Sequence, residues 1–134
     1  MAETTLRYHP ETGKPLPLSV AEFCLMDRHE AKAFMKPLTK KEQWEFSKAY
    51  LVAVNTMPLE KQRELSRKRI EKLEKRPNRS IGDRWELWWA RLYHKLYMVP
   101  EKKRIFFRKF QQKREDFPRW VRYTKSPYLI APKA

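Results

Sequence analysis

The chain of 134 residues carries 31 Lys and Arg against 16 Asp and Glu, which gives a net charge of +15. Its two glycines exclude phosphate-binding loops of the Walker or Rossmann type, and its single cysteine excludes an intrachain disulfide. Scarce glycine and abundant Lys, Arg, Glu and Leu predict a mostly α fold, with about five helices in a small irregular bundle and extended N- and C-terminal arms.

The N-terminal arm is predicted over residues 1–18, where three prolines fix the backbone and remove amide donors. A turn is expected from Pro10 to Gly13. The arm lacks the apolar core of a secretory signal, and Glu3 and Glu11 interrupt any transit peptide. Import through an internal signal, removal of an earlier presequence, and no import at all therefore stay open.

Two helices are predicted after the arm. A capping box that begins at Ser19 predicts a helix running as far as Pro37. A second box, beginning at Thr39, predicts a helix through about Asn55. Apolar residues lie on two faces of this second helix, one of them containing Trp44, so we expect it to be central to the packing.

Residues 58–76 predict a third helix, with Pro58 at its first position. A thin apolar stripe runs along it, and nearly every other residue is charged. Pairs such as Glu64 with Lys68 have the order that stabilises a helix at i,i+4 spacing. Two interpretations stay open: a solvated helix held by a narrow apolar seam, or a basic ridge that faces phosphate or acidic protein.

The clearest periodicity belongs to a helix that we expect to begin with a capping motif at Asp83. One apolar stripe along this helix is predicted to be core: Trp85, Trp88, Leu92, Leu96 and Val99. A second stripe is a candidate contact surface, with burial under the basic helix as the alternative: Trp89, Tyr93 and Tyr97.

A last helix is predicted from Glu101 to Asp116, followed by an extended tail over residues 118–134. Both segments are basic and aromatic, and the tail has no acidic residue. We expect the tail to be ordered by lying across a neighbouring molecule. The predicted organisation is therefore an arm at 1–18, a helical domain at 19–117 and a tail at 118–134.

Charge and aromatic residues occur together in the second half of the chain, since residues 57–134 carry +14 of the net charge and four of the five tryptophans. This combination predicts a large partner. The residues expected to contact nucleic acid or another anionic surface are Lys102, Lys103, Arg104, Arg108, Lys109, Lys113, Arg114, Arg119, Arg122 and Lys125. The residues expected to contact protein are Trp88, Trp89, Tyr93, Tyr97, Trp120, Tyr123 and Tyr128.

Sequence patterns for catalysis and metal binding are missing. The three histidines, at His9, His29 and His94, lie far apart, and Cys24 has no companion at metal-ligand spacing. No serine stands in a nucleophile-elbow motif. We therefore expect no enzyme activity, metal, cofactor or small-molecule substrate. Because no run of about 18 apolar residues occurs, we also expect no transmembrane segment.

Small basic proteins with helical cores and aromatic tails are typical of ribosomes, where cations meet phosphate and rings stack on bases. The first hypothesis is therefore a non-catalytic structural subunit, namely an rRNA-contacting ribosomal protein of an organelle. The second is an accessory subunit of a mitochondrial respiratory complex or ATP synthase, with its cations on acidic subunits or anionic lipid headgroups. Both place the protein in the mitochondrial matrix or on the matrix face of the inner membrane.

A third hypothesis comes from the prolines at Pro17, Pro37 and Pro58, which divide residues 15–75 into three predicted helices, the last long and basic. This arrangement resembles an HMG box, a family that binds and bends DNA from the minor groove. The resemblance covers under half of the chain. It departs from the family pattern because no tryptophan ends the second helix.

Overall fold

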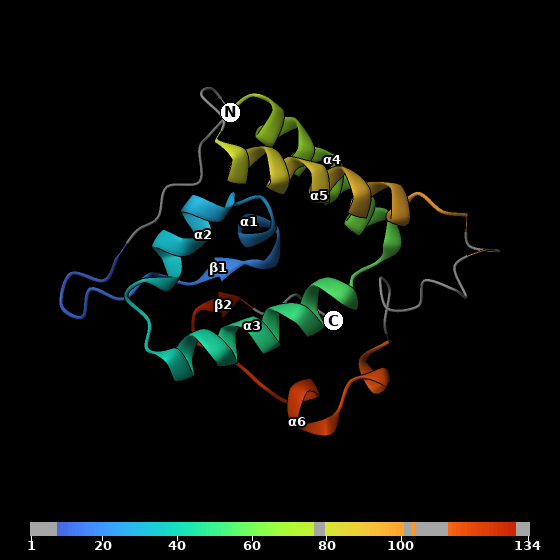
Figure 1. The fold of residues 1–134 in the computed structure, drawn as a ribbon. Helices are drawn as coiled ribbons and strands as arrows, with labels where there is room; N and C mark the ends of the chain where they lie inside the picture. The colour runs from blue at the N-terminus through green and yellow to red at the C-terminus, as the bar shows by residue number, and fades with distance from the viewer. Residues whose placement is uncertain (1–7, 77–79, 101–102, 104–112, 131–134) are drawn as a thin grey trace.

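The computed structural model describes residues 8–76, 80–100, 103 and 113–130, and its fold is drawn in Figure 1. The described elements are β1 (Leu18–Ser19), α1 (Val20–Cys24), α2 (Arg28–Met35), α3 (Lys40–Asn55), α4 (Leu59–Glu74), α5 (Ile81–Tyr97), a 3-10 turn (Arg114–Asp116), α6 (Arg119–Arg122) and β2 (Leu129–Ile130). Helices dominate, and β1 and β2 pair in parallel as a small two-stranded sheet. The predicted mostly α fold class is confirmed.

An aromatic cluster forms the core of the layer that contains α1, α2, α3 and the two strands. Phe34 of α2 and Phe46 of α3 are fully buried. The half-buried Phe23 of α1 packs edge-on against both rings, at centroid distances of 5.7 and 4.9 Å. Leu18 of β1 completes this cluster. The predicted turn before β1 is also present, with Gly13 in the left-handed region at φ 69°.

The single helix predicted from Ser19 to Pro37 is wrong, because the structure divides it into α1 and α2. Ser19 caps α1 as expected, its side chain accepting a hydrogen bond from the Glu22 N–H at 3.1 Å. Asp27 then caps α2 in the same way, accepting from the Glu30 N–H at 2.9 Å. The HMG-box resemblance included a continuous first helix, which the structure does not contain.

The helix α3 begins and ends where the sequence predicts. Thr39 and Glu42 form the complete capping box, in which each side chain accepts a hydrogen bond from the backbone N–H of the other. The face expected to pack through Trp44 is instead turned outward, since Trp44 is 60% exposed and Leu51 is also exposed. The inner face of α3 is built from Phe46 and its neighbours.

The helices α4 and α5 form a second layer and lie side by side (Figure 1). Leu73 of α4 packs against Leu87 and Ala90 of α5 in a separate apolar cluster. The start of α5 differs from the prediction: Ser80, and not Asp83, is the capping residue. Asp83 is the third residue of the helix and completes the capping box by accepting a hydrogen bond from the Ser80 N–H at 3.2 Å.

The C-terminal segment packs against its own chain. Phe117 and Val121, the latter in α6, are buried against Val52 of α3. Further on, the Tyr128 hydroxyl donates a hydrogen bond to Glu42 Oε2 at 2.6 Å. The tail expected to lie across a neighbour therefore contains a turn of helix and a short strand that both contact the first layer. The helix predicted from Glu101 to Asp116 lies mostly outside the described residues. Within them, Lys113 is extended and a 3-10 turn follows, so an α-helix does not run unbroken to Asp116.

Candidate functional site

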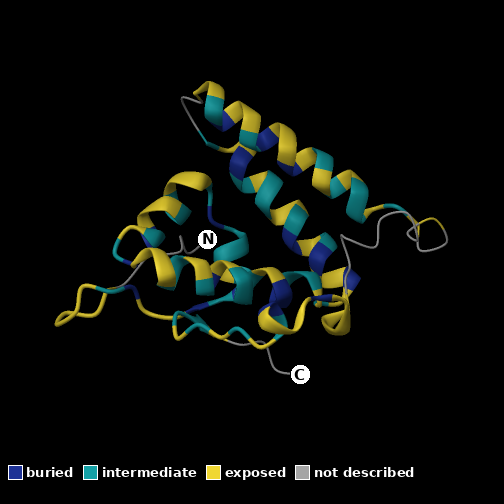
Figure 2. Ribbon diagram, turned by 60° about the horizontal axis from the view of Figure 1, so that its bottom comes forward, coloured by how far each residue is buried: buried dark blue, intermediate teal, exposed yellow. Residues whose placement is uncertain are grey.

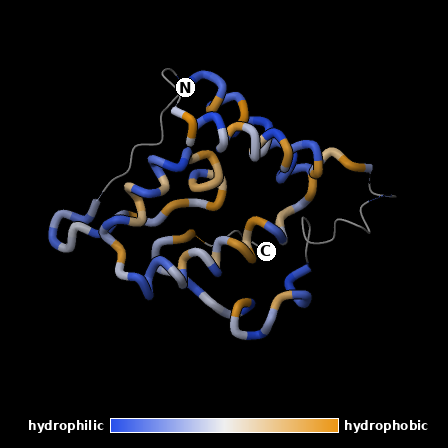
Figure 3. Tube along the Cα trace, in the orientation of Figure 1, coloured by the Kyte–Doolittle hydropathy of each residue, from blue (hydrophilic) through white to orange (hydrophobic). Residues whose placement is uncertain are grey.

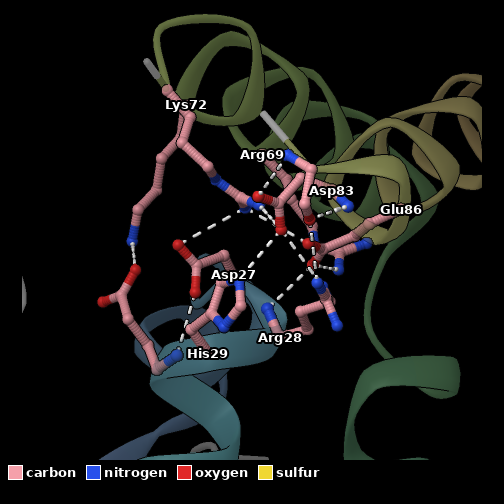
Figure 4. A network of polar contacts seen from close by, with 10 residues as sticks. Asp27, Arg28, His29, Arg69, Lys72, Asp83 and Glu86 are labelled. Atoms are coloured by element: carbon pink, nitrogen blue, oxygen red, sulfur yellow. Dashed lines mark hydrogen bonds and ion pairs between the residues drawn. The ribbon is translucent and has the colours of Figure 1, made fainter. Parts of the chain in front are cut away.

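A network of ion pairs joins α2 to α4 and α5, and Figure 4 shows it from close by. Asp83 lies at its centre, with Oδ1 at 2.7 Å from the Arg76 guanidinium, 3.1 Å from Arg28 Nε and 2.9 Å from His29 Nε2. Arg76 also approaches Asp27 at 3.3 Å and Glu86 at 3.1 Å. The three carboxylates have little exposure, so the cations are needed to hold them charged inside the protein.

The electrostatics of this network follow from opposing effects on its carboxyl groups. Burial acts to raise the pKa of Asp83, but hydrogen bonds from His29, Ser80 and Arg28 and the charge of Arg76 outweigh it and lower the pKa well below its usual range. The pKa of Asp27 is lowered against burial in the same manner, through backbone hydrogen bonds and Arg76. Both groups are therefore carboxylates at neutral pH.

The internal pairing favours the first of the two interpretations of the basic helix, a solvated helix held by a narrow apolar seam. Hydrophilic residues predominate along α4 (Figure 3), and eight cations lie between positions 61 and 76. Five of the eight form ion pairs within the described part of the chain: Arg63, Lys68, Arg69, Lys72 and Arg76. Most of the positive charge of α4 is thus compensated internally, and α4 is a poor candidate for a phosphate-binding ridge.

Three cations on or next to the C-terminal segment, Lys48, Arg114 and Arg122, are arranged differently, because they lie beside exposed rings. Lys48 Nζ of α3 is 5.5 Å from the centroid of Trp44 and 5.1 Å from that of Trp120. Both indoles are more than half exposed. These distances fit cation–π contacts, which hold the ammonium group between two rings that belong to distant parts of the sequence.

Tyr123, which follows α6, is a third exposed ring beside cations. The guanidinium groups of Arg114 and Arg122 are 5.9 and 5.8 Å from the Tyr123 ring centroid, and Tyr123 is 63% exposed. Arg114 also donates a hydrogen bond to the Arg122 carbonyl at 3.2 Å, which fixes the two cations relative to each other. Arg119 and Lys125, which are close to Arg122 in the sequence, are also exposed.

We define the C-terminal basic–aromatic surface as Trp44, Lys48, Arg114, Arg119, Trp120, Arg122, Tyr123 and Lys125. Among the described residues, no carboxylate forms an ion pair with any cation of this surface. Its charge is therefore available to an outside partner, and its three rings are exposed. Those two properties are what contact with phosphate and with nucleic-acid bases requires.

Several predicted contact residues lie outside the described residues, namely Lys102, Arg104, Arg108 and Lys109. Lys103 and Lys113 are described, and both are exposed. The structure brings together Arg114, Arg119, Trp120, Arg122 and Tyr123 as the sequence suggested. It adds Trp44 and Lys48, which sequence reasoning missed because helical periodicity placed Trp44 in the core. Their only sequence signal is the i,i+4 spacing of an aromatic residue and a lysine.

The aromatic helix α5 shows the largest departure from prediction. The stripe expected to be core faces outward, with Trp85 and Trp88 61% and 52% exposed. The inward face consists of Asp83, Leu87 and Ala90. Exposed and buried residues alternate along the helix (Figure 2). The outward position of these rings makes α5 a second candidate surface.

The second aromatic stripe of α5 runs from this surface into the interior. Trp89 and Tyr93 are partly exposed, at 39% and 42%, so they remain candidates for contact. Tyr97 is half-buried and lines the cavity between the two layers. Tyr128, also a predicted contact residue, has its hydroxyl bound to Glu42. Tyr97 and Tyr128 thus contribute to the fold of the chain itself.

The cavity between the layers has a volume of about 370 Å³ and a mainly apolar lining. Cys24 lies on its wall, and burial raises the pKa of this thiol above its ordinary value, so it is not a nucleophilic thiolate at neutral pH. Ser66 Oγ lies 2.7 Å from His94 Nδ1, but the hydroxyl already donates to the Arg63 carbonyl at 2.9 Å. Because a hydroxyl has one proton, a Ser66 hydroxyl that donates to the Arg63 carbonyl can only accept from His94, which is the reverse of a serine activated by a base.

The described residues hold no group of three His, Cys, Asp or Glu side chains placed to bind a metal ion. Within the same part of the chain, no helix is long and apolar enough to cross a membrane. Comparison of the sequence and structure with known protein families, curated proteins and solved structures finds no match.

Proposed function

We propose that the protein is a non-catalytic structural subunit of a large assembly that contacts RNA through the C-terminal basic–aromatic surface, and that this RNA is the rRNA of an organellar ribosome. One observation carries the proposal. Three cations of this surface, Lys48, Arg114 and Arg122, lie beside exposed rings. None of its cations forms an ion pair within the described residues, whereas most cations between positions 61 and 76 are paired internally.

The physical basis is a combination of two contacts. Lysine and arginine that approach phosphates release condensed counterions, which makes binding strong and dependent on salt. Exposed Trp120 and Tyr123 offer faces on which unpaired bases stack, at about 1–3 kcal/mol per base. The flanking Arg122 presents a planar group that can meet phosphate or lie on a base. The arrangement suits loops and single strands of a folded RNA.

A second candidate function is an accessory subunit on the matrix face of a mitochondrial respiratory complex or ATP synthase. The outward-facing tryptophans of α5 favour this candidate, since Trp85 and Trp88 expose large apolar rings. Such rings are typical of surfaces that dock against protein or lie at the headgroup layer of a membrane. Mitochondrial location is part of both proposals.

The experiment is RNA binding by the full chain across a salt series, with a triple variant of the surface, Arg119→Ala/Arg122→Ala/Lys125→Ala. Loss of three phosphate contacts should reduce the slope of log K against log salt by about 2, because each contact with a single strand contributes about 0.7. The matched control removes three exposed cations of α4, in Lys61→Ala/Arg67→Ala/Lys75→Ala. This control has the same net charge as the surface variant and should keep most of the wild-type slope of log K against log salt.

Equal slopes for the two triple variants would mean that binding follows net charge alone, and the proposed interface would be refuted. Co-sedimentation of the protein with its native assembly gives the second readout. Release by RNase supports RNA contact. Persistence through RNase, with release only by detergent, contradicts it and favours the membrane complex.

A further inference from the structure

The outer face of α5 has the spacing of a helix that packs against another helix. Trp85, Trp88 and Leu92 follow the i, i+3, i+7 pattern of a heptad seam, and Ile81 and Leu96 extend the row by one turn at each end. Ile81 is 86% exposed and both tryptophans are more than half exposed. The helix belongs to the α4–α5 layer, which lies at the top of the molecule in Figure 1.

The indoles on this face hold one another in place. Trp85 and Trp88 are stacked, with ring centroids 5.4 Å apart and an interplanar angle of 13°. Trp89 meets both edge-on, at 6.0 and 5.2 Å. Rings already ordered by their neighbours lose little conformational entropy on binding, which is a property of the aromatic anchors that dominate protein interfaces. The aliphatic Ile81 and Leu92 do not stack on bases, so this face differs in kind from the C-terminal basic–aromatic surface.

One edge of the row is positively charged. Arg84, Arg91 and Lys95 are all exposed and follow the seam along the helix. Arg91 shares its charge with Glu74 of α4 at 3.1 Å. The only acidic residues of α5 are Asp83 and Glu86, and both belong to the internal ion-pair network. The outer face of α5 is thus apolar with a cationic edge and no compensating acid of its own helix.

We propose that this face binds an amphipathic helix of a partner protein whose edge carries Asp or Glu. A heptad seam requires an apolar row on the partner, and the cationic edge of α5 requires carboxylates opposite Arg84 and Lys95. The inference concerns a surface separate from the proposed RNA interface and does not rest on RNA binding.

A second copy of the chain fits this face poorly. Arg84 and Arg91 occupy equivalent positions of the heptad, one residue before a seam residue. In an antiparallel pair of identical helices these positions face each other, so Arg would oppose Arg. In a parallel pair they would face Trp89 and Leu96 of the other copy, which offer no carboxylate. Charge complementarity therefore selects a different, acidic-edged helix.

The test uses the full chain and two synthetic four-heptad peptides with the same leucine seam, one with Glu at the flanking positions and one with Lys. Repulsion among its own like charges keeps each peptide from pairing with itself. Binding is measured by fluorescence anisotropy of the labelled peptide. The Glu-edged peptide should bind about tenfold more tightly than the Lys-edged one, since like charges across an interface are strongly unfavourable. The variant Arg84→Glu/Lys95→Glu should reverse this preference.

Two controls establish that peptide binding depends on this face. Lys40→Glu/Lys41→Glu makes the same change of charge at exposed positions at the start of α3 and should leave the preference unchanged. Trp88→Ala should weaken peptide binding about tenfold, as expected for an aromatic anchor, while Trp120→Ala should not. In the RNA-binding assay, Trp120→Ala should weaken binding and Trp88→Ala should not. Failure of one proposal is therefore distinguishable from failure of the other.

Binding of neither peptide, or equal binding of both, would overturn the proposal. Flotation with vesicles of phosphatidylglycerol and phosphatidylcholine, abolished by Trp88→Ala, would assign the face to an anionic membrane instead. A concentration-dependent dimer in sedimentation velocity, also abolished by Trp88→Ala, would assign it to a second copy.

Discussion

Replacement of Arg76 by leucine tests whether the positive charge of α4 is committed to the fold. The Arg76 side chain is only 15% exposed and contacts three carboxylates, those of Asp27, Asp83 and Glu86, at 3.3, 2.7 and 3.1 Å. Removing one member of a buried ion pair costs about 3–5 kcal/mol, because the remaining charge is left uncompensated. Other cations of the network remain in place, so we expect the lower end, a loss of about 3 kcal/mol in the free energy of unfolding.

The assay is urea unfolding at several pH values, followed by far-UV circular dichroism. Arg76 lowers the pKa of Asp83 and Asp27 in the folded protein, and its removal raises both. The difference in unfolding free energy between wild type and Arg76→Leu should therefore be full at pH 7. It should shrink as the pH falls below about 4, where the carboxyls of the unfolded chain become protonated, and vanish only at lower pH, where those of the folded protein do.

The matched control is Arg67→Leu, which removes an exposed cation within α4, the helix that Arg76 follows. Arg67 forms no ion pair among the described residues. Its effect should stay within about 0.5 kcal/mol. A similar, small effect for both variants would refute the argument that the network neutralises α4, and α4 would return as a candidate phosphate-binding ridge.

Two further predictions concern the contacts that hold the termini. The pKa of Glu42 is lowered to about 2, first by the Lys14 ammonium and then by the Thr39 N–H and the Tyr128 hydroxyl. The stability that the Glu42 carboxylate contributes is therefore complete above pH 4.5 and is lost as the pH falls towards 2. Glu42→Gln should remove this part of the pH dependence in urea titrations, and an unchanged profile would contradict the assignment. Phe117→Ala should cost about 3 kcal/mol and speed tryptic cleavage in the α6 segment, because it removes a large side chain from a small apolar cluster. If cleavage is no faster, the packing of Phe117 does not hold this segment.

Local signals in the sequence were sufficient to place the start of a helix where a capping box or a proline fixes the backbone conformation. The capping box that begins at Thr39 placed the start of α3 correctly, because its hydrogen bonds form within four residues. Pro58 likewise marked the start of α4 to within one residue. Asp27 was missed as a helix cap because nothing nearby distinguishes it from a surface carboxylate. Its distinguishing partner is Arg76, which only the packing of α4 brings close.

The orientation of α5 could not be predicted, because periodicity shows that a helix has an apolar stripe but not which stripe is buried. The small Ala90 allows α4 to approach closely, and Asp83 requires the cations of α2 and α4. These two requirements outweigh the larger rings of Trp85 and Trp88, which remain outside. An aromatic stripe left at the surface is typical of interaction sites, and the proposed docking of a partner helix rests on it.

The C-terminal basic–aromatic surface was predicted in part. Its basic and aromatic residues after position 113 are adjacent in sequence and could be named as a group. Trp44 and Lys48 could not, since they join Trp120 only because the Phe117 and Val121 side chains pack on α3. The ion pairs that α4 forms with other helices could not be predicted either, because their carboxylates, such as Glu86 and Glu30, are distant in the sequence.

The most direct test of the central claim is ultraviolet crosslinking of the protein to RNA in its native assembly, with the linked peptides mapped by mass spectrometry. The proposed function predicts crosslinks at Trp120 and Tyr123, with Trp44 as the third position, and none in the segment from Leu59 to Glu74. Crosslinks confined to that α4 segment would contradict the assignment of the interface. The absence of RNA crosslinks from every part of the chain would contradict RNA contact itself.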